Sequence, residues 1–310
     1  MFREELMKKV AIIGAGISGL FIANLFKKNL NYEITIYEKN SFTNLEEGYG
    51  IQLSVNSIKL LNEIGFSKFQ NDKKFNPDKI NFYSFKNSKK ICDLKISDFN
   101  SEDCKYTTLK RSDLVNFLKK DLENLIKTNY SISRIDQENQ KIKLSFENHE
   151  TFDCDYLIIS DGVFSRSKNL ISKNQIQPNY NNTLAVRGII PSSSNVIDKK
   201  NISLFLGPDF HYVIYPVNPN GDLNFISILK YNLSSNEQKN YSLFSDENFI
   251  KEISNNFPLE MKKFLDGIKE LKIFPVFVSN NFFKTKNNNI HFIGDAFFAF
   301  PPSFAQGASQ

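Results

Sequence analysis

The sequence predicts an α/β fold in which a parallel sheet is combined with an inserted antiparallel sheet, and three observations lead to it. Residues 7–13 are a short apolar run ending at glycine, residues 18–28 carry apolar side chains at helical spacing, and residues 33–37 (Glu-Ile-Thr-Ile-Tyr) are predicted to be a second strand. This order fits a βαβ unit. Between about 175 and 274, alternating segments separated by Gly-Pro and Pro-Asn-Gly turns indicate antiparallel strands. The apolar run at 290–294 returns to the first pattern.

The spacing of apolar residues in the other segments predicts the remaining helices and strands. Helices are expected at 57–64 and 112–126, with Ser112 as the N-cap of the second. Further strands are expected at 79–85, 89–94, 132–135, 141–146, 156–159, 203–206, 212–217 and 223–229. The chain is therefore expected to divide into a nucleotide-binding domain at 1–75, 101–175 and 276–310, and a substrate domain at 76–100 and 176–275.

Composition limits the class of protein. The 310 residues are 41% hydrophobic, enough for a sizeable core, and no apolar run reaches the length of a membrane-spanning helix. The three cysteines are too few for a disulfide framework, which favours a reducing cytoplasm. The net charge of +5 comes from scattered lysines without a basic block, so we expect no nucleic-acid partner.

A glycine-rich turn lies between the first strand and the first helix, with the sequence Gly14-Ala15-Gly16-Ile17-Ser18-Gly19. Gly14 permits a tight turn, Gly16 lets the backbone approach a pyrophosphate, and Gly19 lets the helix pack closely on the strand. Glu38 ends the second strand about 20 residues later, where a carboxylate accepts the ribose hydroxyls, and Lys39 follows it. These residues predict a Rossmann-type dinucleotide site, and at this point both NAD and FAD fit it.

Three later segments carry a family resemblance: Leu109-Lys110-Arg111-Ser112-Asp113-Leu114, residues 155–166 with Asp161-Gly162, and residues 294–307 with Gly294-Asp295. With them, the chain from Met7 to Gln310 resembles the single-component FAD-dependent aromatic hydroxylases of the salicylate and para-hydroxybenzoate hydroxylase type. Residues 204–216, with His211 and Tyr215-Pro216, are most similar to the salicylate hydroxylase branch. The resemblance implies a glutathione-reductase-like FAD domain.

The resemblance also implies how FAD is held. Asp295 would hydrogen-bond the ribityl chain, and Arg111 would reach the phosphates or the ribityl region. The remaining contacts would come largely from backbone: Asp161 and Gly162 where FAD and nicotinamide both pass, Gly50 and Ile51 against the isoalloxazine ring, and Gly307, Ala308 and Ser309 at the start of a helix facing the flavin pyrimidine. That helix N-terminus would stabilise negative charge on the reduced ring.

The implied activity is hydroxylation of a small phenol or aromatic acid. FAD would be tightly but non-covalently bound, NAD(P)H would bind transiently, and O₂ would react through a flavin C4a-hydroperoxide. His211 is the candidate base and Tyr215 a candidate substrate-orienting residue, while His149 is expected to be exposed and His291 packed. An apolar wall is expected from Phe297, Phe298, Phe300, Pro301, Pro302 and Phe304.

The sequence departs from the family pattern in three places. Phe298 stands where relatives usually have His, Lys168 stands where they have Arg, and the chain ends at Gln310, so a truncation of the flavin-facing helix is expected. A quinone-biosynthesis ring hydroxylase and a truncated, non-catalytic flavin-binding remnant stay open as alternatives. A flavin-dependent halogenase is disfavoured because the chain has no Trp. The expected assembly is a monomer or a homodimer.

Overall fold

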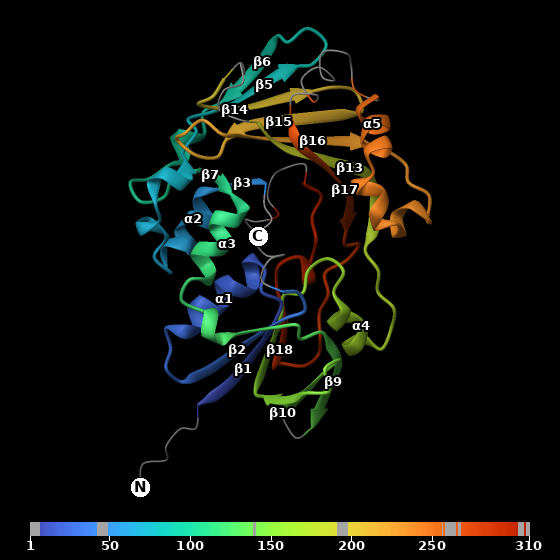
Figure 1. Ribbon diagram of the computed structural model, residues 1–310. Coiled ribbons are helices and arrows are strands. Elements are labelled where there is room, and N and C mark those ends of the chain that lie inside the picture. Colours follow the sequence, from blue (N-terminus) through green and yellow to red (C-terminus); the bar gives the residue numbers. More distant parts are fainter. Residues whose placement is uncertain are drawn as a thin grey trace.

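The structure, a computed structural model, describes residues 7–41, 49–138, 141–190, 198–255, 257, 265, 268–302 and 307. Two large sheets organise these residues, with a parallel sheet at the bottom of Figure 1 and a mainly antiparallel sheet at the top. A small sheet lies between these two large sheets, with helices beside it. Among the described residues, no helix is both long enough and apolar enough to cross a membrane.

The parallel sheet has five strands in the order β18-β12-β1-β2-β8. Each neighbouring pair is parallel, so the carboxyl ends of all five strands share one edge, which we call the carboxyl edge. The strand β18, which is the last one among the described residues, lies at one edge of this sheet beside β12. The strands are β1 (Lys8–Ile13), β2 (Tyr32–Glu38), β8 (Ile126–Thr128), β12 (Tyr156–Ile159) and β18 (Ile290–Phe292).

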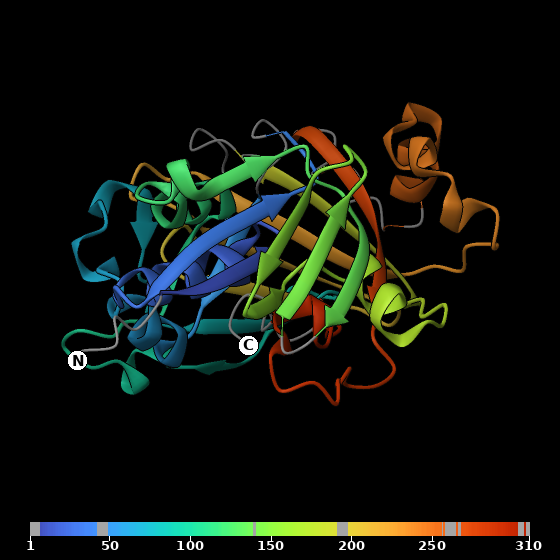
Figure 2. The ribbon, with the colours of Figure 1, turned by 90° about the horizontal axis from the view of Figure 1, so that it is seen from below.

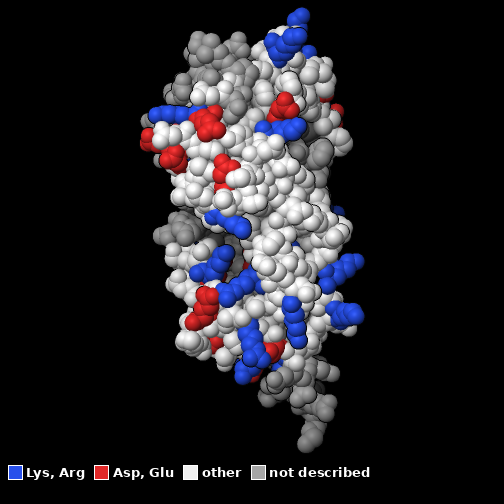
Figure 3. Space-filling view, turned by 90° about the vertical axis from the view of Figure 1, so that its right-hand side faces the viewer, with Lys and Arg blue, Asp and Glu red and all other residues white. Residues whose placement is uncertain are grey.

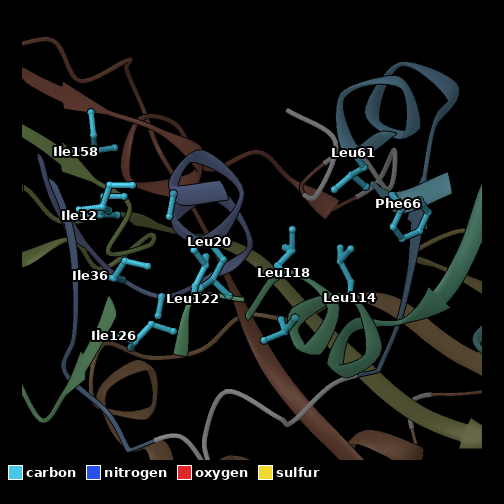
Figure 4. Close-up of a cluster of buried hydrophobic side chains, with 14 of the residues drawn as sticks. Ile12, Leu20, Ile36, Leu61, Phe66, Leu114, Leu118, Leu122, Ile126 and Ile158 are labelled. Carbon is cyan, nitrogen blue, oxygen red and sulfur yellow. The ribbon is translucent and has the colours of Figure 1, made fainter. Parts of the chain in front are cut away.

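Alternating side chains of this sheet enter two different cores, as period-two strands require. Ile12, Ile36 and Ile158 face the helices α1 (Ile17–Lys27), α2 (Val55–Asn62) and α3 (Arg111–Lys119), and Figure 4 shows this core. Ile13 and Ile159 face the other side. There a three-stranded sheet packs in the order β11-β10-β9, as Figure 2 shows from below. Its strands are β9 (Ile132–Glu138), β10 (Lys141–Phe146) and β11 (Thr151–Cys154), and α4 (Arg166–Ser172) follows β12.

The second large sheet has seven strands in the order β17-β13-β16-β15-β14-β5-β6. Its pairings are antiparallel except that β14 pairs with β5 in parallel. One face packs on α5 (Glu247–Asn255) through a core that includes Phe225, Phe249 and Ile253. The strands are β5 (Ile80–Ser84), β6 (Lys90–Leu94), β13 (Asn179–Ile190), β14 (Ile202–Leu206), β15 (Phe210–Pro216), β16 (Leu223–Lys230) and β17 (Lys269–Val278).

The opposite face of the seven-stranded sheet meets a small sheet of order β3-β7-β4, made of β3 (Gly50–Leu53), β4 (Lys74–Phe75) and β7 (Thr107–Lys110). The Gly50 N–H donates to Asn224 Oδ1 at 2.7 Å, and this bond is buried. The Thr108 hydroxyl donates to the Pro216 carbonyl at 2.5 Å, and Lys110 pairs with Asp222 at 3.0 Å. We call this contact region the joint. It fixes the antiparallel sheet against the nucleotide-binding part.

The predicted fold class is confirmed, since an α/β parallel sheet and an antiparallel sheet are both present. One predicted helix is present but shorter than predicted, and its predicted N-cap is wrong. The segment expected as a helix from 112 to 126 begins at Arg111, is preceded by Lys110 rather than capped by Ser112, and ends at Lys119. The strand β8 then starts at Ile126, because that segment extends the parallel sheet beside β2. The proposed domain boundaries remain a prediction.

Charged side chains do not form a continuous block of one sign on the face drawn in Figure 3. Basic side chains gather in its lower half, where acidic and uncharged side chains lie among them. Several lysines are paired locally with carboxylates, as Lys141 is with Asp155 at 2.7 Å. This distribution fits the expectation that the net charge is a property of the solvated surface.

Candidate functional site

Glycine is required by the fold at two positions of the turn that follows β1. Gly14 has a φ of +100°, and a Cβ there would lie 2.5 Å from the Ser160 carbonyl oxygen. A Cβ on Gly19 would lie 2.0 Å from the Gly14 carbonyl oxygen. At the carboxyl edge, the turn after β1 therefore packs so closely on β12 and on α1 that no side chain fits at Gly14 or Gly19.

Gly16 has a different role, because a Cβ there would meet none of the described residues within 4 Å. Gly16 precedes α1 with extended backbone, and no side chain in the described part of the chain caps that helix. The first N–H groups of a helix have no partner within it and attract anions. The open backbone at Gly16, with Ile17 and Ser18 beginning the helix, thus forms a cradle that suits a phosphate group.

Glu38 ends β2 and its carboxylate is fixed against this turn. One oxygen accepts the Ala15 N–H at 2.8 Å, the other accepts the Asn40 N–H at 3.0 Å, and the residue is only 6% exposed. Each carboxylate oxygen keeps a lone pair for a further donor. Lys39, directly after it, is exposed. The placement of Glu38 beside the glycine turn is the one that the dinucleotide motif leads us to expect.

Two aspartates follow the neighbouring strands at the same edge. Asp161 follows β12; one of its oxygens accepts the Ser167 N–H at 3.1 Å, and the other is buried with no hydrogen-bond partner among the described residues. Gly162 has a φ of +82°. Asp295 follows β18, and a Cβ on the preceding Gly294 would lie 2.3 Å from the Ser18 hydroxyl. The turn after β1 therefore touches the end of β12, and the end of β18 touches the first turn of α1.

Lys168 provides a positive charge close to both aspartates. It lies on α4, is almost fully buried, and interacts electrostatically with both Asp161 and Asp295. Burial lowers the pKa of Lys168, and the two carboxylates oppose that shift. The carboxyl group of Asp295 is accessible on one side, where it lines a recess described below, and protein surrounds its other sides. This desolvation raises the pKa of Asp295, and Lys168 opposes that shift.

Two adjoining recesses open beside Asp295. The first has a volume of about 190 Å³ and is lined by Phe282, Gly294, Asp295, Phe297, Phe298, Phe300 and Gly307. The second has a volume of about 260 Å³, shares Phe282, and is lined also by Lys168 and by the amides of Gln177, Asn280 and Asn281. Of the expected apolar wall, Phe297, Phe298 and Phe300 line the first recess together with Phe282, whereas Pro301 and Pro302 line neither recess. Phe304, Ala308 and Ser309 lie outside the described residues.

The joint carries the second group of predicted residues. A Cβ on Gly50 would lie 2.5 Å from the Asn224 side chain, so the β3 backbone touches the antiparallel sheet there, with Ile51 next to it. Arg111, the first residue of α3, donates its N–H to the Tyr49 carbonyl at 2.9 Å. Its guanidinium repels that of Arg187 on β13. Burial, and then this repulsion, lower the pKa of Arg111.

His211 and Tyr215 both lie on β15, on the face of the sheet that meets the joint. His211 is half-buried, and burial lowers its pKa. Tyr215 is fully buried, which raises its pKa, and it hydrogen-bonds Gln52. The Tyr106 hydroxyl donates to the same Gln52 Oε1 at 2.8 Å. Sequence reasoning missed Gln52 and Asn224, since only the pairing of distant strands brings these amides to the site.

The other two histidines are at the surface. His149 is exposed, as expected, in a turn where its φ is +67°. His291 was expected to be packed, and this is wrong. The central residue of β18 is exposed while its neighbours on both sides are buried, because β18 is an edge strand and alternates in and out.

The fold and the carboxyl edge together define a dinucleotide-binding protein whose parallel sheet carries a second, antiparallel sheet over its nucleotide site. The model of the FAD binding domain family matches residues 7–309, and the chain belongs to this family.

Curated proteins that are similar to this chain are named as a monooxygenase and as a hydroxylase. The chain is 24% identical over 225 residues to a 3-amino-4-hydroxybenzoate 2-monooxygenase of Streptomyces cremeus, a match that covers 71% of this chain and 56% of the relative. It is 23% identical over 237 residues to a salicylate hydroxylase of Pseudomonas putida, covering 71% of this chain and 54% of the relative. The match thus spans about half the length of these relatives.

Solved structures share the fold. A salicylate hydroxylase–substrate complex superposes with a TM-score of 0.77 at 17% identity, covering 98% of this chain and 77% of the other. Klebsiella pneumoniae HpxO complexed with FAD and uric acid superposes with a TM-score of 0.79 at 16% identity, covering 97% and 76%.

Proposed function

We propose that the protein is an FAD-dependent monooxygenase that uses NAD(P)H and O₂ to hydroxylate a small aromatic substrate. One observation carries the proposal. The glycine turn, Asp161-Gly162 and Gly294-Asp295 come from three distant parts of the chain and meet at one carboxyl edge, where open α/β sheets bind their ligands. Family membership over residues 7–309 and the names of the relatives support the same reading.

The residues present fit FAD. The open backbone at Gly16 suits the pyrophosphate, Glu38 has lone pairs for the adenosine ribose, and Arg111 supplies a cation. The buried, unpartnered oxygen of Asp161 and the accessible carboxyl of Asp295 are acceptors for hydroxyl groups of the ligand. Bound FAD supplies the redox chemistry, taking up reducing equivalents from NAD(P)H and activating O₂, while the protein positions the ring and excludes water.

On the substrate side, we assign proton transfer to His211. Its lowered pKa keeps the imidazole neutral at neutral pH, so it can accept the phenolic proton that makes an aromatic ring electron-rich. Tyr215, on the same strand face and bonded to Gln52, is held in one position from which it can orient a substrate oxygen. The base and the orienting group thus come from one rigid strand.

The test is oxygen incorporation. The FAD-loaded protein is given NADH or NADPH, ¹⁸O₂ and a panel of hydroxybenzoates and hydroxypyridines, and products are analysed by mass spectrometry. A hydroxylated product carrying one ¹⁸O atom supports the proposal. FAD binding without NAD(P)H-dependent reduction, with every compound tried, would instead indicate a non-catalytic flavin-binding protein.

A further inference from the structure

The first turn of α4 carries a cation that the fold encloses. Lys168 is 5% exposed, and no other lysine or arginine of the described residues is buried. Its N–H donates to Ser165 Oγ at 3.2 Å, which fixes its backbone at the start of the helix. Within the described part of the chain, its ammonium group has no hydrogen bond and no close ion pair. A buried charge of this kind is costly unless charges of opposite sign compensate it.

Two carboxylates compensate the charge of Lys168. Asp161 and Asp295 follow β12 and β18, which are parallel neighbours in the sheet, so both residues lie at the carboxyl edge. Asp161 accepts the N–H of Ser167 at 3.1 Å, and this bond ties the residue next to Lys168 to the end of β12. Among the described residues, these two aspartates are the charged groups that act on Lys168, and Lys168 is the charged group that acts on Asp295. Lys168, Asp161 and Asp295 therefore form one cluster of charges.

Asp295 is the member of this cluster that lines the first recess. The other walls of that recess include Phe297, Phe298 and Phe300, whereas Lys168 lines the adjoining second recess. Burial desolvates the carboxyl group of Asp295 and raises its pKa, and Lys168 opposes that rise. An ionised carboxylate accepts stronger hydrogen bonds than a protonated carboxyl group, in which one oxygen carries a proton. The charge of Lys168 therefore bears on how well Asp295 accepts a hydrogen bond from a ligand.

We propose that Lys168 is a positioning residue whose positive charge keeps Asp295 ionised and ready to accept a hydrogen bond from a hydroxyl group of FAD. This rests on the proposed function for the identity of the cofactor. Lys168 acts through Asp295 and needs no contact with FAD of its own. FAD affinity should then fall as the pH falls through the pKa of Asp295, because protonation removes the stronger acceptor. Removing the charge of Lys168 takes away the influence that lowers this pKa, so the fall should begin at a higher pH.

The experiment measures FAD affinity by the quenching of flavin fluorescence, from about pH 5 to about pH 8, and needs no turnover. Wild-type protein is compared with Lys168→Met, which removes the charge at similar size, and with Lys168→Arg, which keeps it. The midpoint of the pH dependence is expected to rise by at least about one pH unit in Lys168→Met, and to stay within about 0.3 pH unit in Lys168→Arg. The affinity deficit of Lys168→Met should thus grow from less than about 3-fold near pH 8 to at least about 5-fold near pH 5.

Two further variants serve as controls. Lys173→Asn removes an exposed cation at the other end of α4, where Asn also tolerates the φ of +57°, and is expected to leave the midpoint unchanged. Asp295→Asn is expected to remove the pH step. In that background, Lys168→Met should no longer alter the pH dependence, since the group through which Lys168 acts is gone.

Three results would overturn the proposal. If Lys168→Met weakens FAD binding equally at every pH, its charge acts on the FAD phosphates or on the fold rather than through Asp295. A pH step that persists in Asp295→Asn assigns the proton to another group. Wild-type affinity that stays constant down to about pH 5 also overturns it, even if Lys168→Met fails to fold. All three leave the proposed FAD site intact, whereas a wild-type protein that binds no FAD contradicts that site as well.

Discussion

The carboxyl edge and the joint are both candidate binding regions, yet they are built by different means. At the carboxyl edge, close backbone contacts decide the geometry, as at Gly14 and Gly19, where a Cβ would lie within 2.5 Å of a backbone carbonyl oxygen. At the joint, side chains from strands distant in sequence decide it, as Asn224 does by binding Gly50. A backbone site is encoded by a short local motif, whereas a side-chain site depends on the register of a whole sheet.

Two glycines of the same turn are expected to differ strongly in how much they contribute to the free energy of unfolding. Gly14→Ala places a Cβ against the Ser160 carbonyl in a left-handed conformation, so we expect a loss of about 3 kcal/mol or more in the free energy of unfolding. Gly16→Ala meets open space, so its loss is expected to stay below about 1 kcal/mol. Urea unfolding of both variants without FAD measures this. Equal losses would contradict the distinction between a folding glycine and a ligand-approach glycine.

On the sheet face that meets the joint, the main expected effect is on catalysis. His211→Gln is expected to lower kcat/KM at least about 100-fold by removing the base. Because burial lowers the pKa of His211, the wild-type kcat/KM should rise with pH with a midpoint below about 6.5, the ordinary histidine value, and the variant should lose this step. His149→Asn is the control, since His149 is exposed and Asn also tolerates its positive φ. An unchanged pH profile in His211→Gln would remove His211 from the mechanism.

The joint itself should be weakened by Asn224→Ala. This change leaves the buried Gly50 N–H without its acceptor, so we expect a loss of about 2 kcal/mol in the free energy of unfolding. Asp222→Asn also removes a contact across the joint, but the Lys110–Asp222 pair is about one-third exposed, so less than about 1 kcal/mol is expected. Denaturant titration compares the two. If Asp222→Asn costs more, charge pairing rather than the buried amide holds the joint.

The smallest expected effect is at Asp295. Because the folded-state pKa of Asp295 is raised, the ionised carboxylate is disfavoured in the folded protein, and stability falls as pH rises from about 4 through that pKa. Asp295→Asn should therefore stabilise the FAD-free protein at neutral pH. The gain should be less than about 1 kcal/mol, because the carboxylate is partly accessible, and it should vanish near pH 4. A variant that is less stable at neutral pH would show that Asp295 supports the fold directly.

These two regions also show how far the sequence predicts the structure. The glycine turn, Glu38 at the end of β2 and the aspartates after β12 and β18 are local signals, and each is found where its motif places it. Gln52 and Asn224 have no local signal, since strand register brings them to the joint. Helix spacing also failed at residues 120–126, where pairing with β2 outweighs helical periodicity. Exposure of His291 likewise follows from the edge position of β18.

The most direct test of the central claim, that the carboxyl edge holds FAD, is a titration of the FAD-free protein with FAD, followed by the quenching of flavin fluorescence, for the wild type and Gly16→Ala. The account predicts saturable one-to-one binding by the wild type and binding weakened at least about 10-fold in a Gly16→Ala variant that remains folded. Equal affinity of the two proteins, or no binding by the wild type, would contradict it.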